Sequence, residues 1–373
     1  MSLAHRVLGA PGQDNLLRVD VNSGSAIARL QFDCGDRCLD ALTPGAIKAT
    51  EHLFFSHLHM DHVGGFDTFF RSNFDRAGRA VNVWGPPGTA AILHHRFRGF
   101  WWNIVNDVPG TWIVHDVHES HVAPVRFEAR EAFAEAHPLE PRPHAGTIVR
   151  TETFSVEAIA LPHHGVSLGY LVREAPRVVV DRLRLAASGL PSGPWLRALK
   201  AAAAEGEGAR RAWIDVGGTR HDARALAASL LVASPRESIA YVTDFLLDER
   251  TFERLASWLA GVDTLVCEAQ YHPDEAALAV RNHHATIDRV ASLARAARVG
   301  TLVPFHFSER YDRAGWAAML ELARERFPAT VGPPHWGLDP NSARQRTVEV
   351  PIEGGSVAGS TPRKRATTSA SRR

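Results

Sequence analysis

Alternation of apolar and polar residues near the start of the chain predicts a β-meander. The alternating segments are residues 6–9, 15–21 and 26–32, with a turn expected at Asn22-Ser23-Gly24. Short apolar or β-rich runs predict further strands at residues 53–55, 81–89, 100–103, 110–133, 154–161, 238–244, 262–269 and 299–306. The run at 81–89 also passes into a turn and a helix start. Several of these runs end in His or Asp, so candidate functional groups stand at strand ends.

Apolar residues at helical spacing predict helices between these strands. They fall at residues 66–71, 222–232, 249–260, 287–298 and 313–327. The segments 222–232, 249–260 and 313–327 are predicted as outer layers, because a helix with one apolar stripe must bury it against another element. The chain is therefore expected to be an α/β protein.

Composition places the chain among ordinary globular proteins. Of its 373 residues, 45% are hydrophobic and 22% are charged, and the net charge of +1 argues neither for nor against a nucleic-acid partner. No apolar run reaches the roughly 18 residues of a membrane span, and the N-terminus lacks a hydrophobic signal core. Three cysteines, Cys34, Cys38 and Cys267, form no repeating pair pattern. We therefore expect a cytoplasmic protein without a membrane partner.

One short stretch carries four potential metal ligands, namely His57, His59, Asp61 and His62. An apolar run precedes them and Gly64-Gly65 follows, so they lie where a buried strand passes into a loop. Alternation along the extended chain sends His57 and His59 to one side, and a turn brings Asp61 and His62 round to face them. A single histidine is more often a surface or core residue than a ligand. Three histidines and an aspartate within six residues predict a metal site that can hold two ions.

The pattern H-x-H-x-D-H at the end of a hydrophobic strand resembles the signature of the metallo-β-lactamase superfamily. The resemblance implies an αββα sandwich, with two mixed β-sheets between helical layers and two metal ions at one edge. It also implies one hydrolase domain over residues 1–352. The segment 353–373, rich in Gly, Ser and Thr and carrying basic residues, is predicted to be a disordered tail.

The same resemblance requires further ligand loops downstream. It favours His163, which stands six residues before Gly169-Tyr170, although His164 stays open as the alternative. Asp244 and His306, each at the end of a predicted strand, fill the remaining positions. The implied set is His57, His59 and His163 on one ion, Asp61, His62 and His306 on the other, and Asp244 between them. Asp33 is the candidate for an aspartate that braces the first ligand loop, with a surface turn residue as the alternative.

Three further motifs resemble the ribonuclease Z branch of this superfamily. They are His284-x-Thr286, the G-x-P-x-G-P element at residues 189–194, and His306-Phe307-Ser308-x-Arg310-Tyr311. The likeness spans about residues 28–312 and implies precursor tRNA as substrate, a substrate arm at 181–218 and a homodimer as a candidate assembly. The arm is poor in lysine, and phosphate contacts would come from Arg182, Arg184, Arg197, Lys200, Arg210 and Arg211.

The ligand types suggest the chemistry. Imidazoles and carboxylates suit Zn²⁺, and Mn²⁺ or Fe²⁺ would also fit. Two ions about 3.5–4 Å apart can activate water and hold a phosphodiester. Asp61 is the candidate general base. His284, oriented by Glu268, is the candidate donor of a proton to the leaving 3′-oxygen, with an ordinary residue at a helix N-terminus as the alternative.

The function expected is therefore that of a two-metal phosphodiesterase, an endoribonuclease that acts at the 3′ side of precursor tRNA. A second hypothesis keeps the two ions but changes the substrate to a small ester, such as a cyclic nucleotide, an aryl sulfate or a lactone. A third hypothesis is a non-catalytic binding protein stabilised by metal. The complete ligand set and His284 argue against this last hypothesis.

Overall fold

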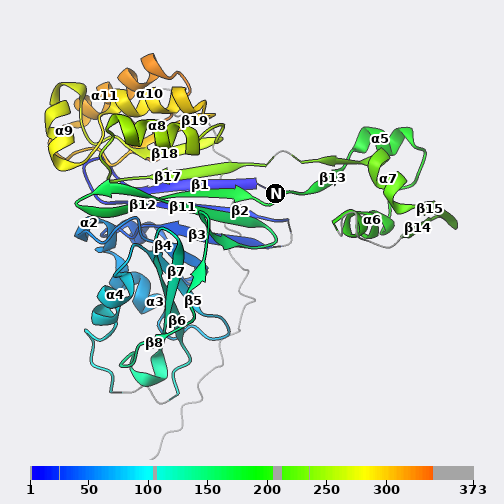
Figure 1. Ribbon diagram of the computed structural model, residues 1–373, viewed down its shortest axis with the longest axis horizontal. Coiled ribbons are helices and arrows are strands. Elements are labelled where there is room, and N and C mark those ends of the chain that lie inside the picture. Colours follow the sequence, from blue (N-terminus) through cyan, green and yellow to red (C-terminus); the bar gives the residue numbers. More distant parts are fainter. Residues whose placement is uncertain (1, 25, 104–106, 205–211, 235, 339–373) are drawn as a thin grey trace, which may run out of the picture.

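Two β-sheets pack face to face between two layers of helices (Figure 1). The computed structural model describes residues 2–24, 26–103, 107–204, 212–234 and 236–338. The predicted domain boundary at 352 and the predicted tail 353–373 lie outside these residues. The helices and sheets stack in layers because each has an apolar face to bury. The order of strands in the two sheets determines which strand ends lie at the same edge of the sandwich.

The first sheet begins with the predicted meander and continues into a parallel centre. Its strands, in spatial order, are β1 (Ser2–Gly9), β2 (Asn15–Asn22), β3 (Ile27–Phe32), β4 (His52–Phe54), β5 (Val81–Gly85), β6 (Thr111–Val117), β7 (His121–Glu128) and β8 (His137–Pro138), with β9 (Arg142–Pro143) also paired to β7. Strands β3 to β6 are parallel and the flanking pairs are antiparallel. The sheet is therefore mixed, as predicted.

The second sheet has an antiparallel half and a parallel half. In spatial order its strands are β10 (Thr147–Arg150), β11 (Phe154–His163), β12 (Gly165–Glu174), β17 (Ser238–Val242), β18 (Thr264–Glu268) and β19 (Thr301–Phe305). Strands β17, β18 and β19 run parallel, joined by helical crossovers. Strands β11 and β12 form a tight hairpin in which His163 pairs with Gly165, so His164 stands alone at its tip.

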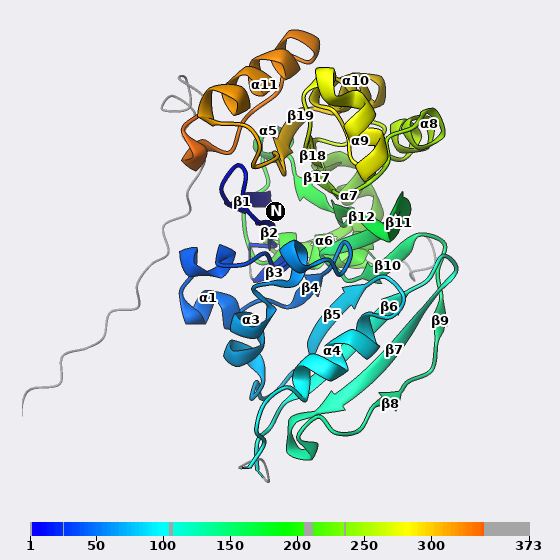
Figure 2. The ribbon, with the colours of Figure 1, turned by 90° about the vertical axis from the view of Figure 1, so that its left-hand side faces the viewer.

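Helices cover the outer face of each sheet. The helices on the first sheet are α1 (Pro44–Lys48), α3 (Phe66–Asn73) and α4 (Thr89–Phe97); those on the second are α8 (Glu249–Trp258), α10 (Ile287–Ala297) and α11 (Arg313–Arg326). Apolar side chains of α3 and α4, such as Phe70 and Phe97, pack on Trp112 of β6. Figure 2 shows the two layers on opposite sides of the sheets. The predicted αββα sandwich is confirmed.

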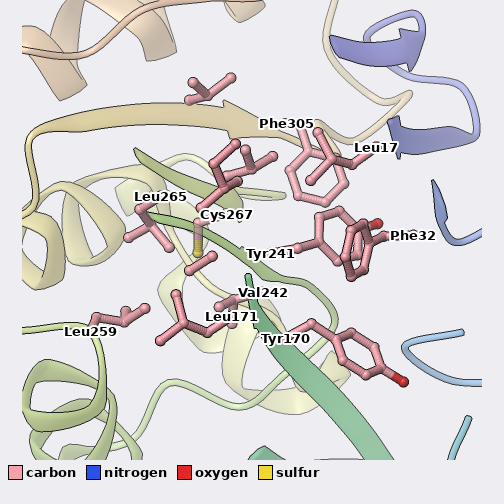
Figure 3. Close-up of a cluster of buried hydrophobic side chains, with 14 of the residues drawn as sticks. Leu17, Phe32, Tyr170, Leu171, Tyr241, Val242, Leu259, Leu265, Cys267 and Phe305 are labelled. Atoms are coloured by element: carbon pink, nitrogen blue, oxygen red, sulfur yellow. The ribbon is translucent and has the colours of Figure 1, made fainter. Parts of the chain in front are cut away.

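The space between the sheets is filled by aromatic and aliphatic side chains. Phe32 of the first sheet packs on Tyr170 and Tyr241 of the second, with ring centroids 5.6 and 5.7 Å apart (Figure 3). All three side chains are fully buried. Aromatic contacts of this kind stabilise by about 0.5–1.5 kcal/mol beyond the area that they bury. They hold the two sheets in register at the edge where the site forms.

An arm projects from the end of the sandwich opposite to α2 (Met60–Val63) (Figure 1). The chain leaves after β12 and returns at β17, and the elements between are β13 (Val178–Val180), α5 (Arg182–Ala187), α6 (Trp195–Ala204), β14 (Trp213–Val216), β15 (Thr219–Asp222), α7 (Ala223–Leu230) and β16 (Leu231–Ala233). The arm has its own small core, which includes Leu199, Ile214 and Leu226. The segment 181–218 lies within this unit.

Two sequence predictions are wrong. The helix predicted at 222–232 forms as α7, but its apolar stripe packs in the arm core and not on the sandwich, because periodicity does not specify the partner face. Residues 100–103 form no strand. Strands β5 and β6, which flank this segment in the chain, pair with each other without a strand between them. Phe100 and Trp101 are instead 46% and 88% exposed.

None of the helices among the described residues is both long enough and apolar enough to span a bilayer.

Candidate metal centre

The candidate metal centre lies at the edge of the sandwich where parallel strands of both sheets end. Strands β3 and β4 run parallel in the first sheet, and β17, β18 and β19 do so in the second. Residues that follow parallel strands gather at one edge even when they are far apart in the chain. The residues brought together in this way are Asp33, His57, Asp244, Glu268 and His306.

Among the described residues, three groups of potential ligands occur, and the third, Asp244, Glu268, His284 and His306, shares Asp244 and His306 with the second. Three histidines form the first ligand cluster. His57 and His59 lie in the loop after β4, and His163 is the last residue of β11. Each offers a ring nitrogen within 4.8 Å of the others. The ring centroids of His57 and His59 are 4.4 Å apart, and those of His57 and His163 are 4.9 Å apart. A set of imidazole nitrogens at this spacing suits a borderline divalent ion.

The second cluster joins the short helix α2 to the ends of β17 and β19. Its members, Asp61, His62, Asp244 and His306, also offer ligand atoms within 4.8 Å of one another. His62 Nε2 lies 3.3 Å from Asp61 Oδ2 and from Asp244 Oδ1. His306 Nε2 lies 3.4 and 3.5 Å from the same two oxygens. Two imidazoles and two carboxylates thus converge on one small volume.

Asp244 faces both clusters. Its Oδ1 atom belongs to the second cluster, whereas Oδ2 lies 3.8 Å from Nε2 of His57 and 3.8 Å from Nε2 of His163. The side chain is buried, and the backbone has a φ of 50° just after β17. A carboxylate in this position can contact one ion with each oxygen.

The ring nitrogens of the candidate ligands fit a pair of cations. Nδ1 of His57 lies 3.1 Å from Ser56 Oγ, and Nδ1 of His163 donates to the His283 carbonyl oxygen at 3.1 Å. Among the described residues, Nε2 of His57 and Nε2 of His62 are buried without a hydrogen-bond partner. A buried polar atom is unfavourable when unpaired. A divalent ion beside each Nε2 would remove that penalty.

Asp33 occupies the centre of a buried hydrogen-bond network that supports both clusters. Its Oδ1 accepts from the Ser56 backbone N–H at 2.7 Å, and its Oδ2 accepts from Tyr241 Oη at 2.8 Å. Oδ2 also lies 2.7 Å from Nδ1 of His62, so His62 donates there and turns Nε2 towards the cluster. Asp33 is fully buried and is not itself in a ligand cluster. This geometry is that of a residue which orients a ligand, and the alternative of a surface turn aspartate is excluded.

Four residues around the site adopt the left-handed backbone region that non-glycine residues seldom occupy. They are Asp33, Asp244, His283 and His306, with φ values between 50° and 58°. Such positions cost on the order of 1–3 kcal/mol each. Asp33 and His306 directly follow a strand and Asp244 comes two residues after one, where a left-handed residue turns the chain sharply.

Neighbouring charges set the protonation of the second cluster in the absence of metal. Burial lowers the pKa of His306, but Asp244 and Asp61 outweigh it and raise that pKa to about 9. Burial opposes the charge on His62 as well, yet Asp244 and Asp33 raise its pKa well above the ordinary value. Both imidazoles therefore hold protons at neutral pH, which an arriving cation would displace.

The first cluster behaves in the opposite way. Burial lowers the pKa of His57 to about 2, and burial also lowers the pKa of His163 to about 4. Both rings are therefore neutral at neutral pH. Neutral imidazoles are the form that binds metal, so this cluster is ready to accept an ion without losing protons.

His284 stands between the clusters and is held by Glu268. Nδ1 of His284 donates to Glu268 Oε2 at 2.9 Å, and it lies 3.9 Å from Asp244 Oδ2. Glu268 is fully buried, and its other oxygen accepts from the Phe245 backbone N–H at 2.9 Å. Burial lowers the pKa of His284, but Glu268 and Asp244 outweigh it and raise that pKa above its usual value. His284 is thus poised to carry a proton.

The structure brings all the predicted site residues to one place. Those residues are His57, His59, Asp61, His62, His163, Asp244, Glu268, His284 and His306. His164 is exposed at the hairpin tip and belongs to none of the ligand clusters found among the described residues.

Several supporting residues were missed by the sequence reasoning. Ser56 contacts both Asp33 and His57, Tyr241 donates to Asp33, and the amide of Gln270 lies 3.4 Å from His306 Nδ1. Ser56 directly precedes the ligand motif, which is the one local signal. The contacts of Tyr241 and Gln270 are long-range and have no counterpart in sequence spacing.

Comparison with known proteins adds independent observations. A ribonuclease Z from Deinococcus radiodurans is 47% identical over 334 residues, which cover 90% of this chain and 98% of that protein. The chain belongs to the ribonuclease Z family. Another ribonuclease Z, from Lacticaseibacillus casei, is 29% identical over 308 residues, with 80% of this chain and 81% of that protein covered. No protein-family model matches the chain.

Solved structures agree on the fold of this ribonuclease Z family member. The metallo-β-lactamase fold protein YhfI from Bacillus subtilis superposes with a TM-score of 0.51, at 11% identity, over 89% of this chain and 96% of that one. The predicted family and fold are therefore confirmed, and with them the prediction of a metal-dependent hydrolase of the endoribonuclease class. The family implies a two-metal site, for which the two ligand clusters are the candidates.

Proposed function

We propose that this protein removes the 3′ extension of precursor tRNA by hydrolysing one phosphodiester bond at the two-cluster site. The observation that carries the proposal is the position of Asp244, whose two oxygens face one cluster each. A carboxylate between two sets of ligands is the arrangement needed to keep two divalent ions close together. The 47% identity to a ribonuclease Z supports the choice of RNA as substrate.

The residues that would hold the ions are those predicted from the sequence. His57, His59 and His163 would hold one ion, Asp61, His62 and His306 the other, and Asp244 both. Zn²⁺ is the first candidate and Mn²⁺ or Fe²⁺ the alternatives, because imidazole and carboxylate ligands accept all three. When bound, two such ions supply Lewis acidity, which lowers the pKa of water and offsets the charge of the phosphodiester.

Asp61 is the candidate group for handling the attacking water. Its side chain is 44% exposed, so solvent water can approach its carboxylate. Burial raises the pKa of Asp61, but hydrogen bonds from His306 and His62 outweigh it and hold that pKa well below its usual range. The carboxylate is therefore ionised at neutral pH and can accept a hydrogen bond from the water. This favours orientation of the water over strong general-base catalysis, which works best with a pKa near the operating pH.

His284 is the candidate proton donor to the leaving 3′-oxygen. It holds a proton more firmly than an ordinary histidine, because Glu268 accepts its Nδ1–H and carries a compensating charge. Its side chain is 10% exposed, so it can reach a bound substrate but not bulk solvent. A positioned general acid of this kind contributes about 10²–10⁴-fold to a rate.

The arm is the candidate surface for the body of the tRNA. Its described cations include Arg182, Arg184, Arg197 and Lys200, whereas Arg210 and Arg211 lie outside the described residues. Arg184 is paired with Asp181 at 3.4 Å, which reduces the charge available for phosphate. We expect a modest dependence of binding on salt, since each phosphate contact releases counterions. The homodimer and the cytoplasmic location stay predictions.

The test is cleavage of a precursor tRNA by the purified protein, with and without a chelator. We expect metal-dependent release of the 3′ extension. The variant His284→Ala should lower kcat by about 10²–10⁴-fold while its metal content stays unchanged. Glu268→Gln should lower kcat less, because an amide oxygen can still accept from His284 Nδ1.

A matched control is His95→Ala, which removes an exposed histidine of α4 away from the site and should leave kcat unchanged. Loss of metal from the His284→Ala variant would refute the proton-donor role. Efficient hydrolysis of a cyclic nucleotide or a lactone, without cleavage of precursor tRNA, would favour the small-ester hypothesis over the proposed function.

A further inference from the structure

Two histidines outside the ligand clusters lie stacked beside the first cluster. The rings of His164 and His283 have centroids 4.6 Å apart and planes only 7° apart. His164 stands at the tip of the β11–β12 hairpin and is exposed to solvent, and His283 follows α9 (Ala276–Asn282). The function described so far uses neither ring.

The backbone holds this His164–His283 pair in place. His283 adopts a left-handed conformation with φ of 57° at the end of α9, and its backbone N–H donates to the Val280 carbonyl oxygen at 3.2 Å. Its carbonyl oxygen accepts from His163 Nδ1 at 3.1 Å. The backbone of His283 is thus hydrogen-bonded directly to the candidate metal ligand His163. The pair is therefore fixed relative to the first ligand cluster.

The surroundings of the pair suit an unstacked base. His164 lies next to two candidate ligands, with ring centroids 4.9 Å from His163 and 6.5 Å from His59. Each element that carries the pair also exposes a valine. Val166 on the hairpin is 43% exposed and Val280 on α9 is 60% exposed. Exposed flat rings are the surface on which proteins stack single-stranded bases.

We infer that the His164–His283 pair is a stacking site for one base of the RNA next to the scissile phosphate. This inference rests on the proposed function and deepens it. The nucleotide in question is the one that keeps the 3′-hydroxyl after cleavage. His283 directly precedes His284, the candidate donor to the leaving 3′-oxygen. The rings of His283 and His284 both lie next to the ring of His163. The base attached to that 3′-oxygen therefore lies on the same side of the ions as the pair.

Stacking tolerates every base, because each presents a flat π-face. The pair would therefore hold the nucleotide without selecting its identity. It would require the nucleotide to be unpaired and turned out of the helix, and this would restrict cleavage to the end of a stem.

The test combines a protein variant with a modified RNA. His164→Ala is compared with the wild-type protein on a precursor tRNA and on the same RNA with an abasic nucleotide at the 5′ side of the scissile bond. We expect His164→Ala to raise KM about 5- to 20-fold on the intact RNA, in the lower part of the range for stacking on an aromatic ring. Its kcat should change less than about twofold. The abasic RNA should raise KM for the wild-type protein by a similar factor, and the variant should show little further rise.

Additional variants separate stacking from folding. His164→Phe keeps a flat ring and should restore KM to within about twofold of wild type on the intact RNA, with unchanged metal content. An RNA that is abasic on the 3′ side of the scissile bond should keep its full dependence on His164. If the effects of His164→Ala and of the 5′-side abasic nucleotide multiply, or if His164→Phe behaves like His164→Ala, the inference is wrong.

The same assay distinguishes the two levels of the proposal. Failure of the wild-type protein to cut intact precursor tRNA would overturn the proposed function and, with it, this inference. Normal cleavage combined with independent effects of protein and RNA changes would overturn this inference alone.

Discussion

Replacement of Asp33 by Asn tests how the second cluster is supported. The two residues have the same size, and Asn tolerates the left-handed backbone of this position, so the change adds no backbone strain. It removes one of two acceptor oxygens and the negative charge. Tyr241 Oη and His62 Nδ1, which lie 2.8 and 2.7 Å from Oδ2, lose a charged acceptor.

The expected size of the effect follows from these two bonds. Hydrogen bonds to a charged group contribute about 1.5–3 kcal/mol each, so Asp33→Asn should lower the free energy of unfolding by about 3–6 kcal/mol. This is a large part of a typical total of about 5–15 kcal/mol. The Asn amide can also donate to His62 Nδ1, which places the ring proton on Nε2, the atom that faces the metal. Loss of such an orienting partner weakens metal binding by about 10- to 100-fold.

Urea unfolding of the chelator-treated protein measures the first quantity, and competitive metal titration measures the second. The matched control is Tyr241→Phe, which removes one donor to Asp33 and leaves the contact between Asp33 and His62 intact. It should cost about 1.5–3 kcal/mol, the contribution of one hydrogen bond to this carboxylate, and change metal affinity less than about twofold. Wild-type metal affinity in Asp33→Asn would show that Asp33 stabilises the fold without orienting His62, and would refute the reasoning.

Two further predictions follow from the site and the fold. Metal binding at pH 7.5 should release protons, because His306 with a pKa of about 9 and His62 hold theirs until a cation arrives. Titration calorimetry in buffers of different ionisation enthalpy measures this proton release. The release should diminish as the pH rises through about 9, and it should be smaller in the His306→Ala variant. Equal heats of metal binding in all buffers would contradict the prediction. Gly110→Ala should lower the free energy of unfolding by about 1–3 kcal/mol, because the new Cβ would lie 2.0 Å from the Phe74 carbonyl oxygen. Urea unfolding checks this, with unchanged metal content as the control. An unchanged midpoint would show that the chain around Gly110 and Phe74 can relax.

Much of this protein could be predicted from local patterns. Alternation and helical spacing located the meander, the strands that end at the site, α3 of one outer layer and α8, α10 and α11 of the other. The H-x-H-x-D-H stretch located the metal site because it places four potential ligands within residues 57–62. These features could be predicted because neighbours in sequence are also neighbours in space.

The chain alone could not decide between His163 and His164. Only the hairpin register, which pairs His163 with Gly165, directs one ring to the cluster and leaves the other at the tip. The helix α7 shows the same limit, since its apolar stripe was identified but its partner was not.

Sequence by itself determined which side chains were available for chemistry and which segments would form strands or helices, since both depend on residue type and short-range spacing. Tertiary structure decided that Asp244 faces both clusters, that Tyr241 of one sheet donates to Asp33 of the other, and that His164 stacks on His283. The physical reason is that these contacts join residues separated by up to about two hundred positions. Their geometry is set by how two sheets pack and by which strands run parallel, and no local pattern encodes either.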